Sequence, residues 1–124
     1  MYLVMKLQMA ASNFGEVKLF GHKYDYDVIV HVDGSISKRK KKKSKDLKPQ
    51  YEHTPLSERE LAFLSDEKPE VVYVGLGYDG ALPVTEEAKE MLSHYQVVML
   101  KTPQVIEKMV DEERKYVAII HVTC

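Results

Sequence analysis

A glycine-rich segment that follows a predicted strand is the sharpest chemical motif in the sequence. Residues 75–80 have the spacing GxGxxG and come directly after the apolar run at 71–74. Glycines in such a turn allow positive φ angles and let backbone N–H groups approach a phosphate closely. The segment could therefore bind a small anion or form a structural turn. The structural interpretation is favoured because this spacing alone has low specificity.

Two features argue against a dinucleotide cofactor. The predicted helix cap, Thr85, lies five residues beyond Gly80, so the glycines do not open the helix. Lys101 follows the next predicted strand, where an acidic residue would bind a ribose. We therefore predict no cofactor. The candidates for binding a small anion or metabolite, with catalysis left open, are Gly75, Gly77, Tyr78, Asp79, Gly80, Lys101 and Thr102.

Histidine and cysteine supply two weaker candidates. His53 could act as a general base, although a loop residue beside a cap at Thr54 is the favoured interpretation. Cys124 could pair with His121 as a nucleophile, but residues three apart on a strand point to opposite faces, so a packed chain end is favoured. No metal site and no established catalytic motif is predicted. The remaining histidines have no ligand spacing and are interpreted as surface or strand residues: His22, His31 and His94.

The net charge of −1 conceals a strongly basic strip. Residues 38–48 contain eight basic residues and one acid, whereas the rest of the chain contains ten basic and eighteen acidic residues. No aromatic residue is interleaved with the lysines, and the acidic remainder would repel nucleic acid. A solvated, mobile loop is therefore favoured over polyanion binding. The residues that would bind a polyanion are Lys38, Arg39, Lys40, Lys41, Lys42, Lys43 and Lys45.

The second half of the chain must position the glycine segment, and its pattern predicts a β-α-β-α-β unit. Apolar runs at 71–74, 97–100 and 116–120 predict buried strands. Thr85 and Thr102 are the predicted caps of two helices between them. Connections of this length predict parallel strands, whose carboxyl ends meet at one edge of a sheet. Segments 75–80, 101–102 and 121–124 are therefore expected to lie together at this edge.

The first half of the chain predicts an antiparallel ribbon. Alternating residues at 16–20 and 27–32 predict strands, with turns at 20–22 and 33–34. After the basic strip, a helix is expected from Thr54 or from a capping box at Ser57 and Glu60, ending near Leu64 before a polar loop at 66–70. The two halves together predict a single α/β domain over residues 1–124 with a mixed central sheet.

Length and composition limit the class of protein. A chain of 124 residues with 44% hydrophobic residues fits one globular domain. No apolar run approaches the length of about 20 residues that a membrane-spanning helix needs, so no membrane association is expected. One cysteine cannot form an internal disulfide, which favours a cytoplasmic location.

Several motifs occur in a characteristic order along the chain. A hairpin precedes Glu-His-Thr-Pro at 52–55, and a strand ending in Gly75-x-Gly77, two β-α units and a closing segment at 121–124 follow. This order, over about residues 14–124, resembles the adipogenesis-associated Mth-domain-containing family, which includes relatives of a mitochondrial complex I assembly factor. The resemblance implies a small α/β domain with a mixed sheet and no established activity or cofactor. The basic strip differs from the Trp-rich, less basic segment of family members.

We therefore expect a small cytoplasmic protein of unknown biochemistry that binds a protein partner and could form homo-oligomers. One alternative is binding of a small anion or metabolite, with or without catalysis, at the edge near residues 75–80. The other alternative is polyanion binding by residues 38–45.

Overall fold

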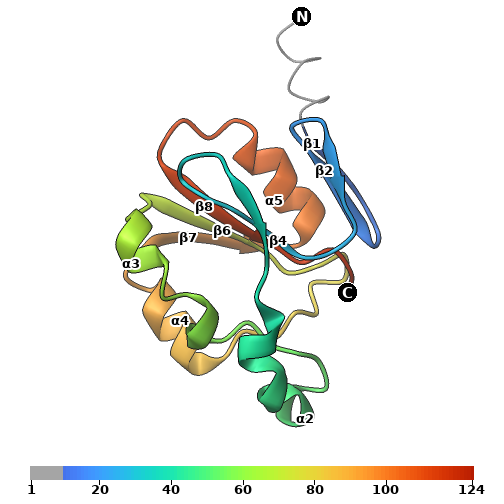
Figure 1. Cartoon of the computed structure of the whole chain (residues 1–124), viewed down its shortest axis with the longest axis vertical. Coiled ribbons are helices and arrows are strands. Elements are labelled where there is room, and N and C mark those ends of the chain that lie inside the picture. Colours follow the sequence, from blue (N-terminus) through green and yellow to red (C-terminus); the bar gives the residue numbers. More distant parts are fainter. Residues whose placement is uncertain (1–9) are drawn as a thin grey trace, which may run out of the picture.

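Eight strands in two sheets form the framework of residues 10–124, the part of the chain that this computed structural model describes (Figure 1). Strands β1 (Ala10–Asn13), β2 (Glu16–Leu19) and β3 (His22–Tyr24) form an antiparallel sheet. The other five form a mixed sheet in the order β5-β4-β8-β6-β7. Their bounds are β4 Val28–Val30, β5 Ile36–Lys38, β6 Val71–Gly75, β7 Gln96–Leu100 and β8 Tyr116–Ile120.

The mixed sheet confirms the predicted α/β class. Strand β6 lies between β7 and β8 and runs parallel to both, so that Tyr73 is opposite Val98 and Ala118. Strand β4 runs antiparallel to β8, and the predicted turn at 33–34 returns the chain into β5. The predicted N-terminal ribbon is divided between the two sheets, because β1, β2 and β3 pair only with one another.

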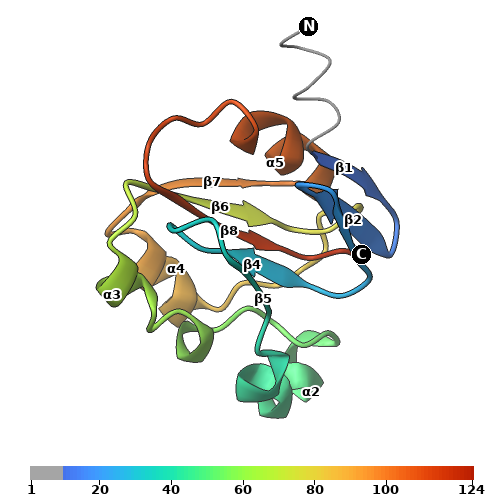
Figure 2. The same cartoon turned by 45° about the horizontal axis from the view of Figure 1, so that its top comes forward.

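Both faces of the five-stranded sheet are covered (Figure 2). Helix α5 (Thr102–Met109) and the three-stranded sheet pack on one face, and α4 (Glu86–Leu92) packs on the other. Successive strand residues point to opposite faces, so every residue of β6 is buried. None of the helices in residues 10–124 has the length and apolar character to span a membrane.

Short helical segments connect β5 to β6. They are η1 (Lys41–Leu47), α2 (Lys48–Tyr51), η2 (Glu58–Glu60) and α3 (Leu64–Glu67), with η denoting a 3-10 helix. The predicted continuous helix ending near Leu64 is wrong, as are the loops predicted for the basic strip and for residues 66–67. The capping box does not form because the Ser57 and Glu60 side chains bond to other elements instead.

Of the two threonines predicted to cap helices, Thr85 does so and Thr102 does not. The Thr85 hydroxyl accepts a hydrogen bond from the Ala88 N–H at 3.1 Å, which confirms this cap. Thr102 lies inside α5, so its predicted capping role is wrong. Its hydroxyl donates to the His121 carbonyl at 2.6 Å and accepts from the Gly77 N–H at 2.9 Å. Thr102 thereby connects the ends of three strands.

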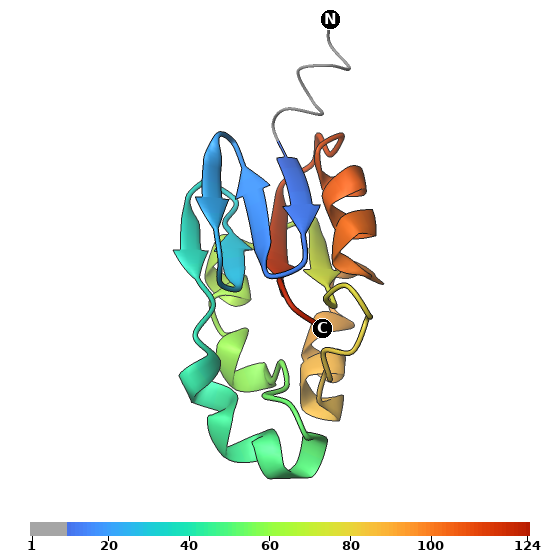
Figure 3. The same ribbon diagram turned by 90° about the vertical axis from the view of Figure 1, so that its right-hand side faces the viewer.

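The carboxyl ends of the parallel strands meet at one edge, as predicted. The Leu76 N–H donates to the Leu100 carbonyl at 2.8 Å, and the Tyr78 N–H donates to the Thr123 carbonyl at 2.8 Å. Figure 3 shows the last residues of the chain (red) beside the loop that follows β6 (yellow). Gly77 has a φ of +93°, and an added Cβ would overlap the backbone of Cys124.

Gly77 lies against the C-terminal tail (residues 121–124), so a side chain at this position should destabilise the fold by steric overlap. This effect can be separated from the strain of a positive φ angle. Gly21 has a similar φ of +88°, but an added Cβ there would meet nothing within 4 Å. We expect Gly77→Ala to lower the free energy of unfolding by about 1–3 kcal/mol beyond the loss in Gly21→Ala, because only Gly77→Ala creates an overlap. Urea denaturation measures the free energy of unfolding of both variants and of the wild type. Equal losses would show that the tail does not constrain this position.

Candidate functional site

The predicted glycine edge is occupied by the chain itself. The Asp79 and Ala81 N–H groups donate to the Cys124 carbonyl at 3.0 and 2.9 Å, so these amides already have an acceptor. The Tyr78 ring packs against Phe14, with 5.7 Å between ring centroids. An added Cβ at Gly75 would lie 2.8 Å from the Thr102 hydroxyl, and one at Gly80 would contact Lys101. Ligand binding at this edge stays a prediction, and it requires the tail to move.

The weaker candidates do not form a hydrogen-bonded nucleophile and base. His53 is exposed, and Cys124 is half-buried. His121 is buried, and its ring bonds to Asp27 and Thr123 rather than serving the cysteine thiol. No three His, Cys, Asp or Glu side chains among residues 10–124 are grouped so that they could hold a metal ion.

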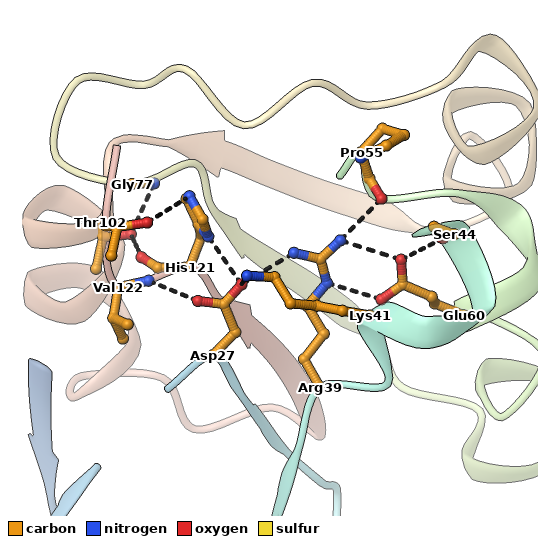
Figure 4. Close-up of polar contacts among 11 residues, drawn as sticks. Asp27, Arg39, Lys41, Ser44, Pro55, Glu60, Gly77, Thr102, His121 and Val122 are labelled. Carbon is orange, nitrogen blue, oxygen red and sulfur yellow. Dashed lines mark hydrogen bonds and ion pairs between the residues drawn. The ribbon is translucent and has the colours of Figure 1, made fainter. Parts of the chain in front are cut away.

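A buried polar network that the sequence did not predict adjoins this edge (Figure 4). Asp27, just before β4, accepts hydrogen bonds from His121 Nδ1 at 2.8 Å, from Arg39 Nη1 at 2.9 Å and from the Val122 N–H at 2.9 Å. Burial by itself raises the pKa of this carboxyl. The hydrogen bond and charge of His121, with the Val122 N–H and the Arg39 charge, outweigh burial and lower the pKa to about 2.

Arg39 connects the Asp27 carboxylate to a second buried acid. Its Nε donates to Glu60 Oε1 at 2.7 Å, and its Nη2 donates to Glu60 Oε2 at 3.1 Å and to the Pro55 carbonyl at 2.8 Å. Ser44 of η1 donates to the same Glu60 oxygen at 2.6 Å. The basic strip is therefore anchored to the protein interior through Arg39 and the fully buried Ser44. Of the predicted polyanion residues, Arg39 is only 3% exposed, whereas the lysines are exposed.

The lysines of the strip have separate surroundings. Lys38 lies over the Tyr26 ring, 5.1 Å from its centroid, and Lys41 Nζ lies 3.9 Å from Asp27 Oδ2. The other four predicted polyanion lysines are exposed, and two of them, Lys40 and Lys43, line a cavity that Lys42 and Lys45 do not line. Polyanion binding by the exposed lysines stays a prediction.

The cavity beside the strip has a volume of about 320 Å³. Its lining combines apolar, basic and hydrogen-bonding side chains: Ile29, His31, Ser37, Lys40, Lys43, Glu60, Ala62 and Phe63. Glu60 belongs both to this wall and to the buried network, so the Arg39–Glu60 ion pair forms part of the cavity's support.

A serine, a histidine and a glutamate form a continuous hydrogen-bonded chain at this cavity. Ser37 Oγ lies 2.7 Å from His31 Nε2, and His31 Nδ1 lies 2.6 Å from Glu67 Oε2. An ionised carboxylate only accepts hydrogen bonds, so we assign the hydrogen of the neutral imidazole to Nδ1. His31 Nε2 then accepts from the Ser37 hydroxyl. This is the geometry in which an imidazole can take a proton from a nucleophilic hydroxyl.

The hairpin and helix α3 position these three groups. Ile29 and Ser37 are cross-strand partners, and His31 follows Ile29 by two residues, so all three side chains lie on one face. Glu67 ends α3, and its other oxygen accepts from the Val32 N–H at 2.9 Å. The Phe63 ring packs edge-on against the His31 ring, with 5.5 Å between centroids. The imidazole is therefore held from three sides.

The sequence does not predict this arrangement. Its pattern indicates a strand or surface residue at His31 and does not select Ser37 or Glu67 as candidates. The predicted turn at 33–34 could have indicated part of the arrangement, because the register of the hairpin places Ser37 across from Ile29 and so on the same face as His31. Nothing local indicates Glu67, which is separated from His31 by 36 residues.

The buried network predicts a large effect of removing its central charge. Arg39→Met leaves Asp27 and Glu60 as buried carboxylates without their cation, so we expect a loss of about 3–5 kcal/mol in the free energy of unfolding. The matched variant Lys42→Met removes an exposed charge of the same strip and should change stability by less than about 0.5 kcal/mol. Urea denaturation compares the two, and equal stabilities would contradict the structural role of Arg39.

The lowered pKa of Asp27 predicts a contribution to acid stability. Its ordinary value is 3.8, so ionised Asp27 stabilises the fold above about pH 4, and this stabilisation is lost as the pH falls toward 2. Between about pH 5 and pH 2, the wild type should lose roughly 2 kcal/mol more unfolding free energy than Asp27→Asn does. Glu112, whose pKa Arg114 and Tyr73 also lower to about 2, is present in both proteins and cancels. Parallel acid profiles would contradict the prediction.

Comparison with solved structures finds this fold in proteins of similar size. PH1505, a conserved hypothetical protein from Pyrococcus horikoshii OT3, is 29% identical with a TM-score of 0.76, over 92% of this chain and 97% of that chain. MT938 is 35% identical with a TM-score of 0.74, over 94% of this chain and 98% of that chain. No family model matches the chain, and no curated protein does. The identity across nearly all of both chains shows that this chain belongs to the same protein family as MT938.

Proposed function

We propose that the protein is a serine hydrolase that cleaves small esters at the cavity beside the basic strip. The observation that carries the proposal is the chain of contacts from Ser37 through His31 to Glu67, with Ser37 and His31 both lining the cavity. A volume of about 320 Å³ is at the lower end of the range for small-molecule sites. The side chains of Ile29, Ala62 and Phe63 provide apolar contacts for a short acyl group.

The reaction uses each of the three groups in a defined way. Ser37 Oγ attacks the ester carbonyl carbon while its proton passes to His31 Nε2. The imidazolium then gives this proton to the leaving alkoxide, which departs as an alcohol and leaves an acyl-serine. Water attacks the acyl group and transfers a proton to Nε2, and that proton returns to Oγ as the acid leaves. Glu67 stabilises the imidazolium and holds its ring in place.

Hydrolysis of 4-nitrophenyl acetate, followed by absorbance of the released 4-nitrophenolate, tests this function. We expect Ser37→Ala and His31→Gln to lower kcat by at least about 100-fold, because each removes the nucleophile or its base. Ser35→Ala is the matched control, since this nearby hydroxyl is exposed and bonds to Asp33. Circular dichroism verifies that each variant folds.

Labelling supplies a second measurement that does not depend on turnover. A fluorophosphonate should add one phosphonyl group to Ser37, identified by peptide mass spectrometry, and the His31→Gln variant should label more slowly. Turnover that is unchanged in Ser37→Ala, together with no label on Ser37, would overturn the proposed hydrolase.

Protein-partner binding is the second candidate function, and exposed aromatic side chains favour it. Phe14 is 62% exposed, Phe20 40% and Tyr26 39%, and all three lie at the turns or end of the three-stranded sheet. Exposed apolar side chains mark an interaction surface where they lie in one contiguous patch. A cytoplasmic location and the narrower relationship to the adipogenesis-associated Mth-domain-containing family belong to the same proposal. They are supported by the single cysteine and by the order of motifs.

A further inference from the structure

Two lysines that line the cavity allow an inference about the substrate, which rests on the proposed hydrolase function. Lys40 and Lys43 line the cavity together with Ser37 and His31, and both lysines are exposed. Glu60 is the acidic side chain in the same lining, and its two oxygens bond to Arg39. Glu60 is thus paired with the buried Arg39, which Asp27 also shares, and Lys40 and Lys43 add two ammonium groups to the lining.

Contacts of neighbouring residues hold the backbone at Lys40 and Lys43 in place. Lys40 follows Arg39, whose guanidinium is held between two buried carboxylates. Arg59 donates to the Lys43 carbonyl at 3.1 Å and forms an ion pair with Asp46. Lys43 also precedes Ser44, which is buried against Glu60. The backbone at both lysines is therefore fixed beside the cavity, although their side chains remain free to reach a ligand.

We propose that the site selects esters that carry a negative charge, bound by Lys40 and Lys43 while Ser37 attacks the ester carbonyl. The apolar side chains of Ile29, Ala62 and Phe63 would contact the uncharged part of such a substrate. The charge could be a carboxylate on the leaving group or at the far end of the acyl chain. The chemistry that recognises it is the same in both cases, a carboxylate accepting hydrogen bonds from two ammonium groups.

Two matched ester pairs test the proposal and distinguish these positions of the charge. The first pair is 4-acetoxybenzoate and its neutral methyl ester, with the charge on the leaving group. The second pair is mono-4-nitrophenyl adipate and its methyl ester, with the charge on the acyl chain. We expect kcat/KM for the charged member of at least one pair to exceed that of the neutral member by about fivefold.

Neutralising the lysines should remove this preference. In the double variant Lys40→Gln, Lys43→Gln, the charged and neutral esters should react with nearly equal kcat/KM, whereas Lys42→Gln should keep the preference because Lys42 does not line the cavity. The preference of the wild type should also shrink as salt is raised from about 20 mM to 0.5 M, since both lysines are exposed to screening.

The outcomes separate the two proposals. Hydrolysis of the neutral esters that depends on Ser37, with no preference for charge in either pair, would overturn the anionic substrate while retaining the hydrolase. A preference that persists in the double lysine variant would overturn the assignment to Lys40 and Lys43. Hydrolysis of every ester at the same rate in Ser37→Ala would overturn the hydrolase and the substrate inference together.

Discussion

A buried guanidinium, that of Arg39, is the group on which the arrangement of this protein depends. It lies between the carboxylates of Asp27, just before β4, and Glu60, in η2. Removing such groups from water costs several kcal/mol for each charge, and only close pairing with full hydrogen bonding offsets that cost. The network meets this condition, since no buried side-chain nitrogen or oxygen among the described residues lacks a hydrogen-bond partner.

This pairing couples parts of the chain that hydrophobic packing leaves separate. The two apolar cores lie on opposite faces of the five-stranded sheet, and neither contains a residue of the basic strip. Through Asp27, the network reaches His121 and Val122 after β8, and through Glu60 it reaches Ser44 in η1. Directional hydrogen bonds therefore fix where the strip lies, and with it the lysines that line the cavity.

The candidate site lies beside this buried network and shares Glu60 with it. Glu60 belongs to the lining of the cavity, and the β4–β5 hairpin supplies His31 and Ser37 to the same lining. Both histidines, His31 and His121, bond through Nδ1 to a carboxylate and through Nε2 to a hydroxyl. They differ in surroundings: His31 faces a cavity, whereas His121 lies against the tail and the glycine loop. Open space beside the hydroxyl, rather than the hydrogen-bond pattern, distinguishes the candidate site.

The sequence by itself determined the elements whose formation depends on neighbouring residues. Strands β6, β7 and β8 are short apolar runs, and the helices between them follow from apolar stripes and from the Thr85 cap. Their parallel order, and the meeting of their ends at one edge, follow from the lengths of the connections. The turn at 33–34 likewise follows from its two residues.

Only the tertiary structure decided which polar side chains are buried and what they bond. Ser57 and Glu60 have the spacing of a capping box, and the strip has the composition of a solvated loop. Long-range partners 13 to 21 residues away override both local preferences. Glu67 is paired with His31 across 36 residues, a contact that no local pattern encodes. Periodicity reports which face of an element is apolar, whereas a polar contact between distant elements depends on how those elements pack.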